Sequence, residues 1–197
     1  GLPVDLVALT GDYRLRVHGG FHHVLPSIEK FARAAGATEG VIATLGNHDP
    51  ADMVAPLEAL GIRVLVNESL TIRRGGAELH VTGLDDVHYF YTDMARDALN
   101  TAPKGFRIAL VHSPEAALLA AEAGFTLYLC GHTHGGQICL PGGIPVITNI
   151  QYRRRFASGP WRCGELTGYT SRGLGTSGLP VRFFSRGEIA LITLRCL

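Results

Sequence analysis

The stretch Leu127-Tyr128-Leu129-Cys130-Gly131-His132-Thr133-His134 places a short apolar run directly before a glycine and two histidines. An apolar run of this length that ends in a turn is typical of a buried strand. The arrangement recurs where Asp5–Thr10 leads into Gly11-Asp12, Val41–Leu45 into Gly46-Asn47-His48-Asp49, and Ile108–Val111 into His112. We therefore expect an Asp, an Asn and three histidines at the carboxyl ends of successive strands, where open α/β sheets place their ligand sites.

Helical and strand patterns alternate through the rest of the chain. Periodicity and capping signals predict helices over Leu25–Ala35, from Pro50 to Leu60, over Asp93–Asn100 and over Pro114–Ala123. Further strands are expected at Arg63–Val66, Leu70–Arg73, Ala77–Thr82, Glu165–Ser171, Val181–Phe184 and Glu188–Leu194, with Gly75-Gly76 as a hairpin turn. Mixed βαβ units followed by a β-rich tail predict an α/β fold, in which two mixed β-sheets pack as a sandwich flanked by helices.

Bulk composition fits one folded domain over residues 1–197. Hydrophobic residues make up 46% and charged residues 18% of the chain, which excludes a disordered protein. The formal net charge of +1 gives no basis for broad binding to nucleic acid. The four cysteines form no CxxC pair, which argues against a zinc ribbon. No run reaches the roughly 18–20 apolar residues that span a bilayer, so a cytoplasmic or peripherally membrane-associated location is favoured.

The polar side chains at the strand ends form a donor set for divalent metals. Carboxylate, amide and imidazole groups suit Mn, Fe or Zn. Asp12 has two oxygens and can bridge two cations, while Asn47, His112, His132 and His134 supply further donors. Any one histidine alone is equally well explained as an ordinary polar residue. The set of five is not, because it follows four separate strands.

Two neighbours of Asn47 have a different expected role. His48 would lie close to a bound phosphoryl group and could donate a proton to a leaving oxygen. Asp49 has two equal interpretations: it orients the His48 imidazole, or it caps the helix that begins at Pro50.

These motifs resemble the calcineurin-like metallophosphoesterase superfamily. The longer string Gly131–Gln137, together with Val111-His112-Ser113-Pro114-Glu115 and Ser171–Gly175, is similar to a bacterial, often membrane-associated subgroup. Some relatives in that subgroup hydrolyse the pyrophosphate bond of a UDP-diacylglucosamine lipid precursor.

The resemblance implies a role for each matching residue. Asp12 would bridge two divalent cations, with Asn47, His112 and His132 completing one site and His134 belonging to the other. His48 would act as the acid or contact the phosphate. The implied reaction is hydrolysis of a phosphoester or pyrophosphate bond by a metal-bridged hydroxide. The implied substrate is a phosphorylated small molecule or a lipid, and the apolar Ile138–Ile147 segment fits the lipid.

The chain departs from the superfamily pattern at its beginning. An Asp-x-His motif on an earlier strand would supply two ligands to the second metal, and none precedes Asp12. We expect the domain to be N-terminally incomplete, with its first strand missing and its second metal site incomplete. Substitution by His18, His22 and His23 is a minority alternative.

Weaker signals are interpreted conservatively. Gly173–Gly178 matches GxGxxG, but Pro180 and a strand follow where a dinucleotide fold needs a helix. Arg172 could bind a substrate phosphate or be structural. Arg153-Arg154-Arg155 could contact anionic lipid, although a solvated loop is favoured, and Asp85-Asp86 with His88 is expected to be a polar turn. Alternative functions are a cyclic-nucleotide phosphodiesterase, a phosphomonoesterase, or a non-catalytic scaffold of the same fold.

Overall fold

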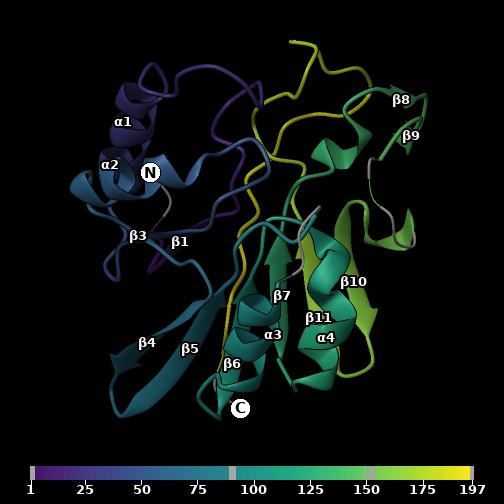
Figure 1. Cartoon of the computed structure of the whole chain (residues 1–197). Helices are drawn as coiled ribbons and strands as arrows, with labels where there is room; N and C mark the ends of the chain where they lie inside the picture. Colours follow the sequence, from purple (N-terminus) through teal and green to yellow (C-terminus); the bar gives the residue numbers. More distant parts are fainter. Residues whose placement is uncertain (1–2, 89–91, 149, 151–153, 196–197) are drawn as a thin grey trace.

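Two parallel-stranded regions form the centre of the computed structural model, which describes residues 3–88, 92–148, 150 and 154–195 (Figure 1). The larger sheet has the strand order β10-β11-β7-β6-β5-β4. Its inner pairs β5–β6, β6–β7 and β7–β11 are parallel, while β4 and β10 pair antiparallel at its edges. The bounds are β4 Glu68–Arg74, β5 Ala77–Gly83, β6 Phe106–Leu110, β7 Leu127–Cys130, β10 Gly159–Cys163 and β11 Leu166–Thr170.

The smaller sheet has the order β1-β2-β3, and both of its pairs are parallel. Its strands are β1 Val7–Leu9, β2 Val41–Ala43 and β3 Ile62–Val64. A separate antiparallel pair joins β8 Cys139–Leu140 to β9 Ile144–Pro145.

Alternation along the strands divides the core between the layers. In β6, Ile108 and Leu110 join Ile42 of β2 in a buried cluster between the two sheets. The intervening Ala109 and Val111 belong instead to the cluster beneath the helices of the larger sheet. This period of two sends neighbouring side chains to opposite faces. The result is the expected arrangement of mixed sheets flanked by helices.

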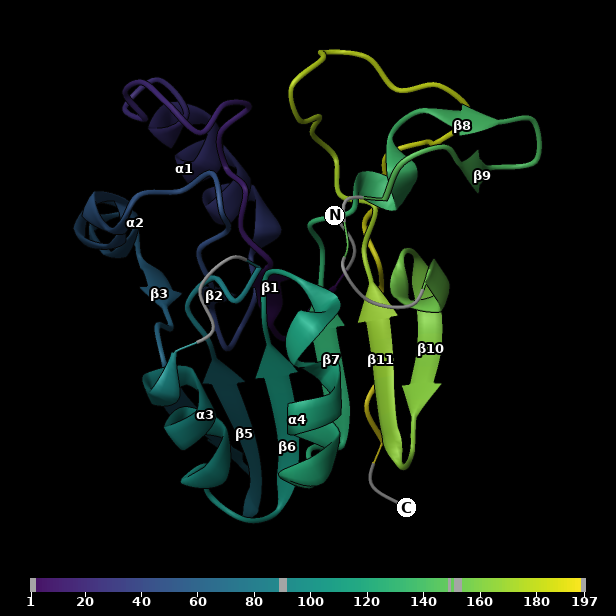
Figure 2. The same cartoon turned by 45° about the vertical axis from the view of Figure 1, so that its right-hand side comes forward.

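Helices cover the outer face of each sheet. Helices α1 Leu25–Ala35 and α2 Val54–Ala59 pack on the smaller sheet through residues that include Ile28 and Leu57. Helices α3 Asp93–Asn100 and α4 Ala117–Glu122 cover one face of the larger sheet, as Figure 2 shows. Within the part of the chain that the structure describes, no helix is both long and apolar enough to cross a bilayer.

Most predicted elements are confirmed, with two helices divided. The helix expected from Pro50 begins as a 3₁₀ turn, η1 Ala51–Met53, before α2, and that expected from Pro114 begins as η2 Pro114–Ala116 before α4. The Gly75-Gly76 turn is confirmed, because both glycines adopt positive φ between β4 and β5. Further 3₁₀ turns are η3 His134–Gly136 and η4 Arg154–Phe156.

The two strands predicted last in the chain are wrong. Val181–Phe184 makes one isolated bridge, between Ile138 and Phe183. Glu188–Leu194 forms no strand with any described residue, and Ile189 and Leu191 are 70% and 63% exposed. An alternating apolar pattern becomes a strand only when a neighbour satisfies its backbone hydrogen bonds, and no neighbouring strand of the described chain does so here.

Candidate metal centre

Two glycines allow the loops after β1 and β2 to meet. A Cβ added at Gly11 would lie 2.5 Å from the backbone nitrogen of Gly46. A Cβ added at Gly46 would lie 2.6 Å from Cε1 of His112. Only residues without a side chain permit this approach. It brings Asp12 and Asn47, from the smaller sheet, next to the histidines that follow β6 and β7.

Four polar side chains converge at this edge of the two sheets. His112 Nε2 lies 3.1 Å from Asn47 Oδ1, 3.1 Å from His132 Nδ1 and 3.4 Å from Asp12 Oδ2. His132 Nδ1 also lies 3.1 Å from Asn47 Oδ1. Asp12, His112 and His132 are the cluster of potential metal-ligating side chains found among the described residues. The sequence prediction that these residues lie together agrees with this geometry.

The donor set fits a divalent cation. His112 Nδ1 lies 2.6 Å from the carbonyl oxygen of Thr10, so that nitrogen carries a hydrogen, and a cation that displaces the proton on Nε2 would meet the lone pair of that nitrogen. This lone pair faces an amide oxygen and a second imidazole nitrogen at 3.1 Å. Metal–nitrogen bonds of about 2.0–2.1 Å would separate neighbouring ligand atoms by roughly 3.0–3.4 Å. The observed separations are of that size.

Electrostatics within the cluster couple Asp12 to His112. Burial disfavours the charged form of Asp12, but the hydrogen bond from His112 and the charges of His112 and His48 outweigh it and lower the pKa of this carboxyl group. Burial likewise opposes charging of His112, but Asp12 and the Thr10 carbonyl outweigh it and raise the pKa of the ring. The buried cluster therefore favours positive charge next to Asp12.

His134 approaches the same carboxylate oxygen of Asp12 as His112 does. Its Nε2 is buried, has no hydrogen-bond partner among the described residues, and lies 3.9 Å from Asp12 Oδ2. Burial lowers the pKa of the His134 ring to about 4, despite the opposing charge of Asp12. The carbonyl of His134 accepts hydrogen bonds from Arg182 and Ser185, which hold its backbone in place. A neutral imidazole with an unshared lone pair at this position can serve as a second metal ligand.

His48 is fixed by backbone contacts that the sequence did not reveal. Its Nδ1 lies 3.1 Å from the carbonyl oxygen of Arg14, and its backbone N–H donates to Asp12 Oδ1 at 3.1 Å. The buried guanidinium of Arg14 donates in turn to the carbonyl oxygens of His48, Val17 and Gly19. Arg14 thus ties the loop after Asp12 to His48. An isolated arginine in a loop carries no sequence signal for this role.

Asp49 makes neither of the two contacts expected for it. Its carboxylate accepts hydrogen bonds from the backbone N–H groups of Asp12, Tyr13 and Gly46, at 2.7, 3.0 and 2.9 Å. The first residue before η1 is Pro50, and no side chain caps that turn. Burial raises the pKa of Asp49 to about 6, although the Gly46 N–H opposes the shift. Asp49 joins the two metal-site loops to each other because it bonds to both.

His88 and Glu115 form a buried pair behind the cluster. His88 Nδ1 lies 2.9 Å from Glu115 Oε1, and the ring centroids of His88 and His132 are 4.1 Å apart. The polar turn expected at Asp85-Asp86 and His88 therefore packs against a candidate ligand without joining the ligand cluster. Glu115 is the last residue of the Val111–Glu115 motif, so the sequence did contain a signal for its position near the site.

The remaining candidate residues lie in other contacts. Arg172 Nε donates to Ser158 Oγ at 3.0 Å and lies 3.6 Å from Glu188 Oε2, which favours its structural interpretation. His18 and His23 line surface clefts and are not part of the ligand cluster. Arg155 is exposed and its guanidinium lies 4.8 Å from the Phe156 ring centre, whereas Arg153 lies outside the described residues.

Comparison with known proteins identifies the family. A model of the calcineurin-like phosphoesterase family matches residues 2–136. The uncharacterized metallophosphoesterase YkuE of Bacillus subtilis is 34% identical over 97% of this chain and 68% of its own length. The uncharacterized metallophosphoesterase Cj0846 of Campylobacter jejuni is 28% identical over 97% of this chain and 50% of its own length. The phosphodiesterase YaeI of Escherichia coli is 27% identical over 96% of this chain and 70% of its own length.

This similarity supports phosphoester hydrolysis and implies the use of divalent metals. The matched region contains the loops that bring Asp12, Asn47, His112 and His132 together. The chain belongs to the calcineurin-like phosphoesterase family.

Proposed function

We propose that this protein hydrolyses a phosphodiester or pyrophosphate bond with divalent cations held by Asp12, Asn47, His112 and His132. The observation that carries the proposal is the convergence of their donor atoms at 3.1–3.4 Å. Bound cations would supply Lewis acidity toward the phosphoryl oxygens and activate water. The mixed oxygen and nitrogen donors suit Mn, Fe or Zn.

Two further side chains complete the proposed site. His134, whose Nε2 has no hydrogen-bond partner among the described residues, would hold a second cation together with Asp12. His48 would present Nε2 to the leaving oxygen, because its Nδ1 donates to the Arg14 carbonyl, and it would donate from Nε2 as an imidazolium, in which both ring nitrogens carry hydrogen. Asp49 would support catalysis indirectly, by holding the Asp12 and Gly46 loops together.

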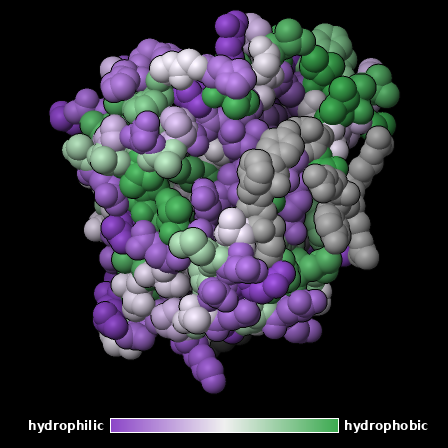
Figure 3. All heavy atoms as spheres, viewed as in Figure 1, coloured by the Kyte–Doolittle hydropathy of each residue, from purple (hydrophilic) through white to green (hydrophobic). Residues whose placement is uncertain are grey.

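A lipid-linked substrate is the favoured class within this proposal. Large apolar side chains are exposed next to the site on two segments, 138–147 and 174–184. Backbone hydrogen bonds from Phe183 to Gln137 and from Cys139 to Phe183 join these segments. We call these side chains the apolar rim: Ile138, Leu140, Ile144, Val146, Ile147, Leu174, Leu179, Val181, Phe183 and Phe184. Figure 3 shows apolar atoms gathered over β8 and β9. Exposed apolar patches of this kind mark membrane or ligand contacts.

The test of the metal and the chemistry compares two buried histidines. His132→Ala removes a proposed ligand, whereas His80→Ala removes a buried histidine that bonds to Thr71 in the larger sheet, outside the cluster. Metal content and hydrolysis of bis(p-nitrophenyl) phosphate are measured after Mn²⁺ loading. We expect His132→Ala to lose at least tenfold in hydrolysis and to hold less metal per chain than wild type, and His80→Ala to retain both. Wild-type protein that holds no metal and cleaves no ester would favour the scaffold alternative.

A substrate panel separates the enzymatic alternatives. Cleavage confined to p-nitrophenyl phosphate would indicate a phosphomonoesterase, and cleavage confined to cyclic nucleotides a cyclic-nucleotide phosphodiesterase.

Binding of the protein to a lipid surface is tested by sedimentation with anionic phospholipid vesicles. Ile147→Ser should weaken binding, while Met94→Ser, which alters an equally exposed apolar residue on α3, should not. Equal binding by both variants would exclude the apolar rim as the contact surface.

A further inference from the structure

Gln137, at the end of the histidine signature, clamps a distant loop. Its Nε2 donates to the carbonyl oxygens of Ser177 at 3.0 Å and Leu179 at 2.9 Å, and its Oε1 accepts from the Ser177 N–H at 2.6 Å. All polar atoms of this side chain are therefore bonded to one three-residue segment. Gln137 also has φ 49° and ψ −51°, an unfavourable conformation for a residue with a side chain.

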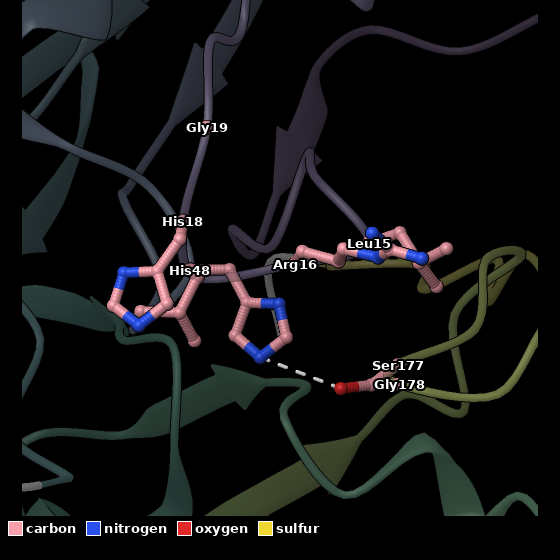
Figure 4. A pocket seen from close by; sticks show the side chains of 8 residues that line it. Leu15, Arg16, His18, Gly19, His48, Ser177 and Gly178 are labelled. Carbon is pink, nitrogen blue, oxygen red and sulfur yellow. Dashed lines mark hydrogen bonds between the residues drawn. The ribbon is translucent and has the colours of Figure 1, made fainter.

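The clamped segment faces His48. Ser177 Oγ lies 3.4 Å from His48 Nε2, and the other ring nitrogen of His48 contacts the Arg14 carbonyl. In Figure 4 the Ser177 hydroxyl points to the His48 ring, while His18 lies on the opposite side of that ring. Nε2 of His48, which would face the substrate, is thus the ring nitrogen that the clamped loop approaches.

An open cleft of about 700 Å³ begins at this point. One wall is the loop from Leu15 to Gly19, and the other is Ser177 and Gly178, with His48 between them. A phosphoryl group alone needs far less space, and volumes of roughly 300–1,000 Å³ are typical of sites for organic ligands. Leu15 and Val17 give the cleft apolar surface, and Arg16 and His18 add polar groups at its exposed side.

We propose that this cleft takes the organic group attached to the substrate's phosphoryl group, and that Gln137 is a positioning residue for one of its walls. The inference rests on the proposed phosphoester chemistry. Without the clamp, the Ser177–Leu179 loop loses three hydrogen bonds and keeps the longer one from the Gly178 N–H to the Leu15 carbonyl, at 3.4 Å, so it forms a less firmly held surface beside His48. Gln137 itself does not line the cleft, so it acts through the loop.

The test compares two ligands that share a phosphonate group. Dissociation constants of phenylphosphonate and methylphosphonate are measured by calorimetry on the Mn²⁺-loaded protein. We expect wild type to prefer phenylphosphonate by about tenfold, because the ring removes apolar surface from water. Gln137→Ala should abolish most of this preference and leave methylphosphonate binding within about twofold. Damage to the metal centre would instead weaken both ligands equally and would overturn the positioning role.

A matched variant separates the clamp from backbone strain. Gln137→Gly removes the same hydrogen bonds but tolerates positive φ. If the Gln137 hydrogen bonds hold the loop, both variants lose the preference for phenylphosphonate. The Ser177 amide then exchanges its hydrogen at least tenfold faster in each variant than in wild type, with or without metal. Wild-type behaviour of Gln137→Gly, or unchanged exchange in Gln137→Ala, would refute the proposal. Absence of hydrolysis by wild type would remove the proposed function, while binding and exchange would still decide this inference.

Discussion

Replacing Gly46 by alanine should damage the metal centre more than the fold. The added Cβ would lie 2.6 Å from the Asp12 backbone nitrogen and 2.6 Å from His112 Cε1. Ordinary carbon contacts are about 3.5–4.0 Å, so these groups must move apart by roughly 1 Å. The φ of Gly46 is not among the positive values, so alanine fits the local backbone and the whole effect comes from this contact.

The expected losses of stability and of metal affinity depend on how much displacement the packed core and the metal site each tolerate. Overpacking a filled site costs about 1–3 kcal/mol, which lowers the melting temperature of a domain of this size by roughly 3–9 °C. Ligand distances in a metal site tolerate only about ±0.2 Å. A displacement of about 1 Å at Asp12 or His112 should therefore lower metal affinity by at least 10–100-fold.

Thermal denaturation without metal and Mn²⁺ titration by calorimetry measure the two effects separately. Gly20→Ala is the matched control, because a Cβ there meets no atom within 4 Å. It should change neither the melting temperature nor the affinity. Wild-type Mn²⁺ affinity in Gly46→Ala would refute the placement of the metal between these loops, whatever the melting temperature.

Three further predictions concern parts around the site. Asp49→Ala leaves three backbone N–H groups without their acceptor and should lower the free energy of unfolding, measured in urea, by about 3 kcal/mol or more. A smaller loss would show that water replaces the carboxylate. Thr170→Val removes the acceptor that lies 2.8 Å from the Trp161 indole nitrogen and should cost about 1–3 kcal/mol, which fluorescence of the single tryptophan can follow. Burial raises the pKa of the Cys130 thiol to about 12, and Cys139 and Cys163 are buried as well, so in a Cys196→Ser variant no described thiol should react with iodoacetamide before unfolding. Rapid labelling of the native variant would contradict the burial.

The ligand cluster could be predicted from sequence because it depends on a rule of sheet architecture. Parallel strands of one sheet end at one edge, so His112 and His132, which follow β6 and β7 of the larger sheet, must lie near each other. Asn47 follows β2 of the smaller sheet, and its Oδ1 lies 3.1 Å from both histidines because the two sheets pack with these ends together. Gly11 and Gly46 could be recognised as turn residues, but neither their contact with each other nor that of Gly46 with His112, which follows a strand of the larger sheet, could be predicted.

The surroundings of the cluster depend on contacts that leave no local pattern. Asp49 bonds to a loop 36 and 37 residues away, and Ser177 meets His48 across 129 residues of sequence. Neither contact changes the periodicity or turn composition of its own segment. The failed strand at Glu188–Leu194 has the same origin, because strand formation depends on a partner that the apolar pattern does not specify.

Backbone strain connects the proposed site with the proposed clamp. Among the described residues, six other than glycine have positive φ, and four of these are Asp12, His132, His134 and Gln137. Left-handed conformations cost such residues about 1 kcal/mol or more each, and glycine at any of these positions would remove that cost. Glycine would also remove the carboxylate and imidazoles of the proposed metal centre and the Gln137 amide that bonds to the Ser177–Leu179 loop. The proposed function offers a reason why side chains stand in conformations that oppose stability, and by this argument Gln137 belongs with the proposed metal ligands rather than with the ordinary turn residues.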